Sequence, residues 1–221
     1  AAMAVASGAA RIAAAQTSSH FCTAERQYRA PVPYGSQRAP TAQWTATAAG
    51  CCVLAAQSDG PYLTHATRGR IVDLGVTDAA NMGAAMAPAA HDTLSALFRD
   101  TATSPEDYDL IVTGDLGELG HRLLVELFRR DGVTLGENCT DCGILLYDRL
   151  RQDMHAGGSG CGCSAAVLNG YLLHGLRAGK WQRMVFAPTG ALLSPTSSFQ
   201  GESVPGICHA VVLSRTKEAL G

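Results

Sequence analysis

The most informative segment is Ala156-Gly157-Gly158-Ser159-Gly160-Cys161-Gly162-Cys163-Ser164-Ala165, because a glycine-rich turn leads here directly into a helical pattern, Ala165 to Ala178. Glycine lets the backbone take positive φ and approach another group closely. The start of a helix offers free N–H groups and a partial positive charge. The segment therefore predicts a turn suited to a carboxylate, a phosphate or an oxyanion, and a tight packing turn is the alternative.

Composition excludes several classes of protein. The 221 residues suffice for one large domain or two small ones. The net charge of −2 shows no electrostatic footprint for nucleic acid. No apolar run is long enough to span a membrane, and no small-residue cleavage site follows a basic region as in a signal peptide. We therefore expect an intracellular chain that binds no nucleic acid.

The cysteines do not form a recognisable metal site. The eight are Cys22, Cys51, Cys52, Cys139, Cys142, Cys161, Cys163 and Cys208. Cys139-x-x-Cys142 resembles half of a zinc site or a redox pair, but Cys161-x-Cys163 has the wrong spacing for the other half. We expect reduced thiols and no metal.

The order of elements predicts an α/β protein. The expected strands are Arg11 to Gln16, Gln43 to Gln57, Pro61 to Val72, Tyr108 to Thr113, Arg183 to Thr189 and Val204 to Arg215. The expected helices are Ala1 to Ala10, Met86 to Arg99, one turn at Ser104 to Asp107, Leu119 to Arg130 and Ala165 to Ala178, while Cys142 to Tyr147 is ambiguous. Pro61 to Val72 should pair antiparallel with Gln43 to Gln57 across the turn Ser58-Asp59-Gly60. Strands and helices alternate in the second half, which indicates buried strands.

Loops at strand ends mark a candidate cleft. Ligands of α/β sheets bind beyond the carboxyl ends of the strands. Three such loops are Thr17 to Arg29, Gly114 to Gly120 and Gly190 to Pro195. We expect them to converge with the glycine-rich turn.

Longer motifs resemble a known family. In order they are Ser18-Ser19-His20, Thr23-Ala24-Glu25-Arg26-Gln27-Tyr28-Arg29, Asp73-Leu74-Gly75, Ala85-Met86-Ala87-Pro88-Ala89-Ala90, Thr113-Gly114-Asp115-Leu116, Asp141-Cys142-Gly143 and Gly190-Ala191-Leu192-Leu193-Ser194-Pro195. Together with the glycine-rich turn they resemble, from end to end of the chain, the stage V sporulation protein AD family of the thiolase-like superfamily.

The resemblance implies a layered α/β/α/β/α fold built from two related halves. Residues 1–60 would be the end of the first half and 61–221 the whole second half. Ala1 to Ala10 resembles the helix that follows the nucleophilic cysteine of thiolases, so this chain would lack the nucleophile and residues that precede it in a longer protein. Members of the superfamily usually dimerise through a sheet edge that corresponds to the region near Arg11 to Gln16, which implies a homodimer.

The resemblance also implies that the catalytic pattern is missing. Ketoacyl synthases place a His in the loop where this chain has Thr113-Gly114-Asp115, and an Asn where it has Ser159. Those side chains donate hydrogen bonds to a thioester oxygen, whereas Asp115 would bring negative charge there. An acid/base cysteine at Cys161 or Cys163 is the alternative, because the start of a helix lowers the pKa of a thiol.

The family's role is the uptake and release of dipicolinic acid, usually with calcium, beside the SpoVA membrane proteins at the spore inner membrane. The resemblance therefore implies a non-catalytic dipicolinate-binding protein in the spore, peripheral to that membrane and without a cofactor. The candidate ligand-binding residues are Ser18, Ser19, His20, Arg26, Arg29, Asp115, Gly158, Ser159, Gly160 and Cys161.

Each candidate has a plainer reading. A helix start and an arginine fork suit the two carboxylates of dipicolinate, but Arg26 and Arg29 could equally form a dimer contact or surface ion pairs. His20 could be structural, and Asp115 could orient Ser159, cap the helix at Leu119 or contribute one oxygen to calcium. For the whole protein, an acyltransferase with its nucleophile in a missing segment and a purely structural partner of membrane subunits are the alternative functions.

Overall fold

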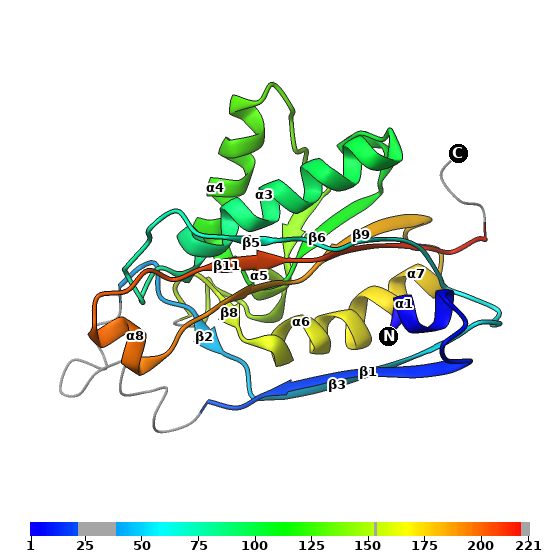
Figure 1. Ribbon diagram of the computed structural model, residues 1–221, viewed down its shortest axis with the longest axis horizontal. Coiled ribbons are helices and arrows are strands. Elements are labelled where there is room, and N and C mark those ends of the chain that lie inside the picture. Colours follow the sequence, from blue (N-terminus) through cyan, green and yellow to red (C-terminus); the bar gives the residue numbers. More distant parts are fainter. Residues whose placement is uncertain (22–38, 153, 218–221) are drawn as a thin grey trace.

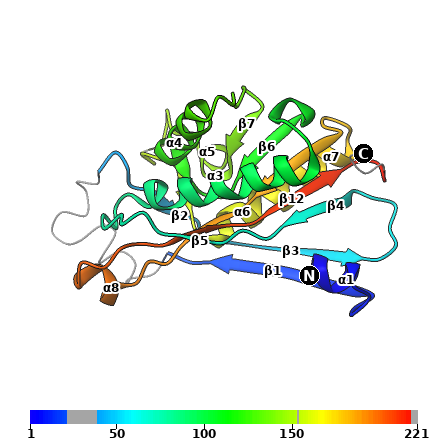
Figure 2. The ribbon, with the colours of Figure 1, turned by 45° about the horizontal axis from the view of Figure 1, so that its top comes forward.

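The computed structural model describes residues 1–21, 39–152 and 154–217, which form four layers (Figure 1). Helices α3 (Met82–Thr101) and α4 (Gly117–Arg130) cover one face of a five-stranded sheet. The helical segment 161–177 covers the other face, and a two-stranded ribbon lies beyond it. Figure 2 shows the same order of layers from a second direction.

The central sheet has the strand order β4-β12-β9-β6-β7. Its strands are β4 (Tyr62–Thr67), β12 (Ala210–Ser214), β9 (Arg183–Ala187), β6 (Leu110–Thr113) and β7 (Cys139–Asp141). Strand β6 runs parallel to both β7 and β9, whereas β12 is antiparallel to β9 and β4. Parallel neighbours need long crossovers, and α4 supplies the one between β6 and β7. The α/β class is therefore confirmed.

Side chains of the central strands divide the core into two. Ile111 and Val185 belong to the cluster under α3 and α4, while Val112 and Met184 belong to the cluster under residues 161–177. Successive side chains of a strand point to opposite faces, so strands covered on both faces must be apolar throughout. This explains why all four residues of β6 are buried.

The ribbon consists of β1 (Ile12–Ser19) and β3 (Ala48–Ala55), paired antiparallel along their whole length. The short helix α1 (Ala2–Ala6) precedes it, which confirms the first part of the helix predicted for Ala1 to Ala10. Strand β1 runs three residues beyond the predicted strand, because Thr17 to Ser19, predicted as loop, continue the pairing with β3.

One predicted strand pairing is wrong. The segment predicted as Pro61 to Val72 forms β4 and β5 (Ile71–Val72), and neither pairs with β3: β4 pairs with β12, and β5 with β11 (Gly206–Cys208). A turn signal such as Ser58-Asp59-Gly60 fixes a reversal of the chain but not the strand's partner. Here the chain leaves the ribbon after β3 and enters the central sheet as β4.

The remaining elements are short. They are β2 (Trp44–Thr45), η2 (Pro105–Asp107), α5 (Cys142–Leu146), β8 (Gly158–Ser159), α6 (Cys161–Val167), η3 (Leu168–Leu172), α7 (Leu173–Arg177), β10 (Thr189–Ala191) and α8 (Pro195–Phe199). The capping box at Ser104 confirms the predicted helical turn there. The predicted last strand, Val204 to Arg215, is in fact two strands in different sheets.

Gly83 lets α3 approach α4 closely. A Cβ at this position would lie 2.7 Å from the carbonyl oxygen of Leu116 and 2.8 Å from the nitrogen of Gly120. We expect Gly83→Ala to lower the free energy of unfolding by about 1–3 kcal/mol, because backbone atoms cannot move aside as a flexible side chain can. Gly170→Ala is the control, since nothing lies within 4 Å of its added methyl group. Urea unfolding that found the two variants equally stable would contradict this reading.

Candidate functional site

The glycine-rich turn connects β8 to α6 and lies against the ribbon at the end of β1. Strand β8 pairs in parallel with β2, which places Ser159 beside Thr45. Gly160, with φ of 91°, then begins the helix. At Gly162 an added Cβ would lie 2.3 Å from the carbonyl oxygen of Ala48. Glycine is required at both positions, at one for its backbone conformation and at the other for close approach.

Asp115 joins three loops at this turn. Its Oδ2 accepts a hydrogen bond from the Gly160 N–H at 2.8 Å, and its Oδ1 accepts one from the Thr189 hydroxyl at 2.9 Å. The backbone N–H of Asp115 donates to the same hydroxyl oxygen at 3.1 Å. Only 7% of Asp115 is exposed. The predicted convergence of the loop after β6 with the glycine-rich turn is therefore present. The third contact comes from Thr189, at the start of β10 and one residue before the predicted loop Gly190 to Pro195.

Ser19, at the end of β1, binds the same turn from the ribbon side. Its hydroxyl donates to the Ala46 carbonyl at 2.6 Å and accepts from the Gly162 N–H at 2.9 Å. The neighbouring Cys161 thiol donates to the Ser18 carbonyl at 3.0 Å. The ribbon is thus fastened to the turn by polar contacts.

A fully buried carboxylate, Asp141, holds the loops that carry Asp115. Its Oδ2 accepts from the Thr113 hydroxyl at 2.7 Å and the Leu116 N–H at 2.9 Å. Its Oδ1 accepts from the N–H groups of Gly117 at 3.0 Å and Gly143 at 2.8 Å. Burial raises the pKa of this carboxyl, and the four donors pull the pKa the other way.

The proposed capping role of Asp115 at the helix near Leu119 is wrong. Helix α4 begins at Gly117, and the N–H groups of Leu116 and Gly117 donate to Asp141 instead. The pattern of an Asp before a helix pointed to the nearest carboxylate in sequence. The actual partner comes from the end of a neighbouring parallel strand, and only the sheet order places it there.

Gln43 is a site residue that the sequence reasoning did not single out. Its side-chain amide donates to the Asp115 carbonyl at 2.6 Å and to the Gly158 carbonyl at 3.2 Å. Gln43 had been placed at the start of an apolar strand, where a polar residue carries no distinctive signal. Thr189 was missed for the same reason. Asp141, by contrast, stood in a motif quoted for the family.

The structure separates the predicted ligand-binding residues into two groups. Gly158 and Ser159 are buried, and the Ser159 hydroxyl lies 3.4 Å from that of Thr45. Ser18, His20 and Cys161 are exposed beside them. Arg26 and Arg29 lie outside the described residues.

The buried thiols around the turn do not resemble an activated nucleophile. Burial raises the pKa of Cys163, Cys142 and Cys139, the last to about 12, and the negative charge of Asp141 adds to each increase. The expectation that the helix start lowers the pKa of Cys163 is therefore wrong, because the side chain is removed from water and lies near two carboxylates. In the described ranges no group of three or more His, Cys, Asp or Glu side chains could hold a metal ion.

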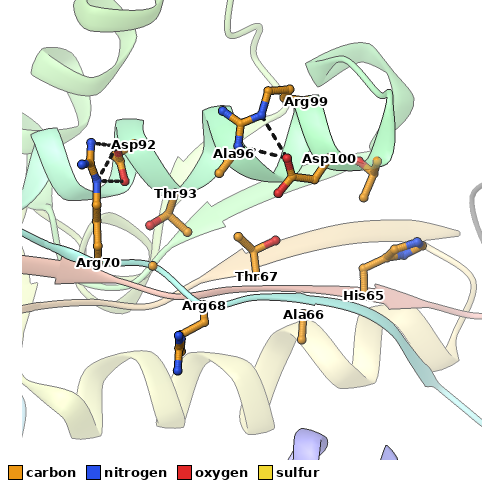
Figure 3. Close-up of a pocket in the computed structure, with 12 residues that line it drawn as sticks. His65, Ala66, Thr67, Arg68, Arg70, Asp92, Thr93, Ala96, Arg99 and Asp100 are labelled. Atoms are coloured by element: carbon orange, nitrogen blue, oxygen red, sulfur yellow. Dashed lines mark hydrogen bonds and ion pairs between the residues drawn. The ribbon is translucent and has the colours of Figure 1, made fainter.

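A groove lies away from the turn (Figure 3). It has a volume of about 650 Å³ and lies between β4 and α3, on the other side of the central sheet. Arg70 and Asp92 face each other across it, with N–O distances of 2.9 and 3.0 Å. Thr67 and Thr93 also point toward it (Figure 3). Arg70 is paired with Asp92, and Arg99 with Asp100, so these four charges are compensated, while Arg68 also lines the groove.

Comparison with known proteins identifies the family. The family model of stage V sporulation protein AD matches residues 1–214. The chain belongs to the stage V sporulation protein AD family. The stage V sporulation protein AD of Bacillus subtilis (strain 168) is 46% identical over 208 residues, which are 94% of this chain and 61% of that protein. The chain therefore spans less than two thirds of the length of the Bacillus subtilis protein.

Solved structures support a thiolase-like fold. A tetronic acid condensing enzyme superposes with a TM-score of 0.57 at 15% identity, covering 96% of this chain and 62% of the enzyme. The 3-oxoacyl-(acyl carrier protein) synthase III of Pseudomonas aeruginosa PAO1 gives 0.53 at 13% identity, covering 96% and 61%. At such identities the likeness concerns the fold alone.

Within the part of this chain that the structure describes, no helix is long and apolar enough to cross a bilayer.

We expect Asp141→Asn to destabilise the protein strongly. An amide cannot accept all four hydrogen bonds and would turn an N–H₂ group toward backbone N–H donors. The loss should be on the order of 2–4 kcal/mol, as for buried hydrogen bonds to a charged group. Asp78→Asn is the control, because its exposed carboxylate accepts from one backbone N–H, of Ala80, and an Asn oxygen can replace it. Equal midpoints of urea unfolding for the two variants would refute the role given to Asp141.

His121, on α4, should make stability depend on pH. Burial lowers its pKa, while Asp141 and Glu118 oppose this and Arg149 adds to it. The unfolded chain, with a His pKa of about 6.5, then binds more protons than the folded one. The free energy of unfolding should therefore be highest above a pH of about 6.5 and should decrease as the pH falls from there through the lowered pKa of the folded state. His121→Gln should flatten this dependence in urea unfolding from about pH 5 to 7.5, and His20→Gln, an exposed control, should not.

Proposed function

We propose that this chain belongs to a non-catalytic dipicolinate-binding protein of the spore. The observation that carries the non-catalytic part is the position of Asp115, whose carboxylate binds the Gly160 N–H at 2.8 Å. In ketoacyl synthases, which the chain resembles, this loop carries a His that donates to a thioester oxygen. A carboxylate there would oppose charge developing on that oxygen.

The thiols support the same proposal. Acyl transfer through cysteine needs a thiolate, and burial raises the pKa of Cys163 beside the turn. The Bacillus subtilis relative is longer than this chain, and a nucleophile could lie in the segment that this chain does not span. Even then, the carboxylate of Asp115 would stand where the thioester oxygen needs a hydrogen-bond donor. The proposal is therefore binding without chemistry.

The chain belongs to a sporulation family and resembles a protein that handles dipicolinate. Both points support dipicolinate as the ligand. Dipicolinate is a planar dianion, so a site for it needs cationic side chains and exposed donors. Ser18, His20 and Cys161 form an exposed strip beside the turn. Arg26 and Arg29 follow Phe21 closely in sequence and would supply the positive charge. Calcium would enter with dipicolinate as part of the ligand.

The proposal extends to location and assembly. We place the protein in the forespore and spore, peripheral to the inner membrane, beside the membrane proteins of the same uptake and release machinery, and as a homodimer. The ribbon supports an interface: neither β1 nor β3 carries a charged side chain, and Ile12 and Val53 are 66% and 70% exposed. Uncharged exposed strands favour pairing with another chain segment.

Calorimetric titration with dipicolinate tests the function, and coenzyme A is the parallel ligand. We expect micromolar binding of dipicolinate, on the order of −8 kcal/mol, to this chain and to the Bacillus subtilis relative. Arg26→Ala should weaken it at least tenfold by removing a bidentate partner for a carboxylate, and Arg11→Ala, an exposed arginine outside the proposed site, should not.

Binding of coenzyme A without dipicolinate would favour an acyltransferase instead. Binding of neither ligand, with the chain folded, would favour a structural partner of membrane subunits.

A further inference from the structure

The carboxylate of Asp115 already holds a donor that an external anion would need at the glycine-rich turn. The Gly160 N–H donates to its Oδ2 at 2.8 Å, and the Thr189 hydroxyl donates to its Oδ1 at 2.9 Å. Both contacts are within hydrogen-bonding distance, and together they engage both oxygens of the carboxylate. The turn is therefore occupied by an anion that belongs to the chain itself.

The N–H groups of Gly162 and Cys163 are also used. The Gly162 N–H donates to the Ser19 hydroxyl at 2.9 Å, and the Cys163 N–H donates to the Gly160 carbonyl at 2.9 Å. An incoming carboxylate or oxyanion would have to displace Asp115 before it could bind Gly160.

Charge acts in the same direction as occupancy. Asp115 is buried, and the buried carboxylate of Asp141 lies nearby, because it accepts from the N–H groups of Leu116 and Gly117, the two residues that follow Asp115. Like charges repel more strongly where water is excluded. A free anion at this turn would therefore meet both a filled donor and a repulsive field.

We propose that Asp115 is a specificity-determining residue, a resident anion that closes the glycine-rich turn to carboxylates and acyl oxyanions. Dipicolinate then binds at the exposed strip of Ser18, His20 and Cys161 and not at the Gly160 N–H. The second statement rests on the proposed function. The first does not, because it concerns any small carboxylate.

Acetate is the probe, and the Gly160 amide signal in ¹H–¹⁵N NMR spectra is the readout. In the unsubstituted chain this signal should not move as acetate is added. In Asp115→Ala the Gly160 signal should shift until it saturates. The apparent affinity for acetate should be at least tenfold higher than in the unsubstituted chain. Asp115→Asn should shift less than Asp115→Ala, because its amide oxygen can still accept from the Gly160 N–H.

A matched control is Asp73→Ala. The Asp73 carboxylate accepts from the Gly75 N–H at 2.9 Å and from the Ser203 hydroxyl at 2.6 Å, which repeats the contacts of Asp115 at an exposed place. This variant should leave the response of Gly160 unchanged. If Asp115→Ala does not fold, Asp115→Ser makes the same test, because its shorter side chain removes the carboxylate.

Two results would overturn the proposal. One is a Gly160 signal in the unsubstituted chain that titrates with acetate as strongly as in Asp115→Ala. The other is a folded Asp115→Ala or Asp115→Ser variant whose Gly160 signal does not respond. Dipicolinate titration of the unsubstituted chain is a separate measurement, so failure of the proposed function remains distinguishable from failure of this inference.

Discussion

The buried carboxylate of Asp141 is the contact on which the arrangement of the site depends. Placing a carboxyl group out of water is costly unless donors surround it, and this one receives three backbone N–H groups and one hydroxyl. Those donors come from the end of β6, the start of α4 and the start of α5. Because one side chain satisfies them all, these three elements are held in a fixed relation, and the loop that carries Asp115 follows from it.

Asp115 then connects this rigid group to the rest of the molecule. Its carboxylate reaches the turn before α6 and the hydroxyl of Thr189, so the second core, under residues 161–177, is tied to the loops at the strand ends. Ser19 ties the ribbon to the same turn. The N–H groups of Gly160 and Gly162 at the turn are thus engaged by the chain's own polar groups. This pattern suits a protein that holds a ligand beside the turn better than one that stabilises a reacting oxyanion within it.

The family assignment and the proposal of a non-catalytic protein rest on different grounds. The match over residues 1–214 establishes a sporulation family, and the solved relatives establish only the fold. The choice between catalysis and binding depends on Asp115 and on the buried thiols. Cys163 illustrates this: its place at a helix start predicted a lowered pKa, whereas burial beside two carboxylates raises the pKa of its thiol.

Elements whose signals are local could be predicted from the amino-acid sequence. The glycine-rich turn, the capping box at Ser104 and the buried strand at β6 follow from residue chemistry within a few positions. The tertiary structure alone decided which strands pair, since β4 joins β12 across most of the chain, and which carboxylate serves the start of α4. Those outcomes depend on contacts between residues far apart in sequence, where burial and sheet order choose the partner and no local pattern records the choice.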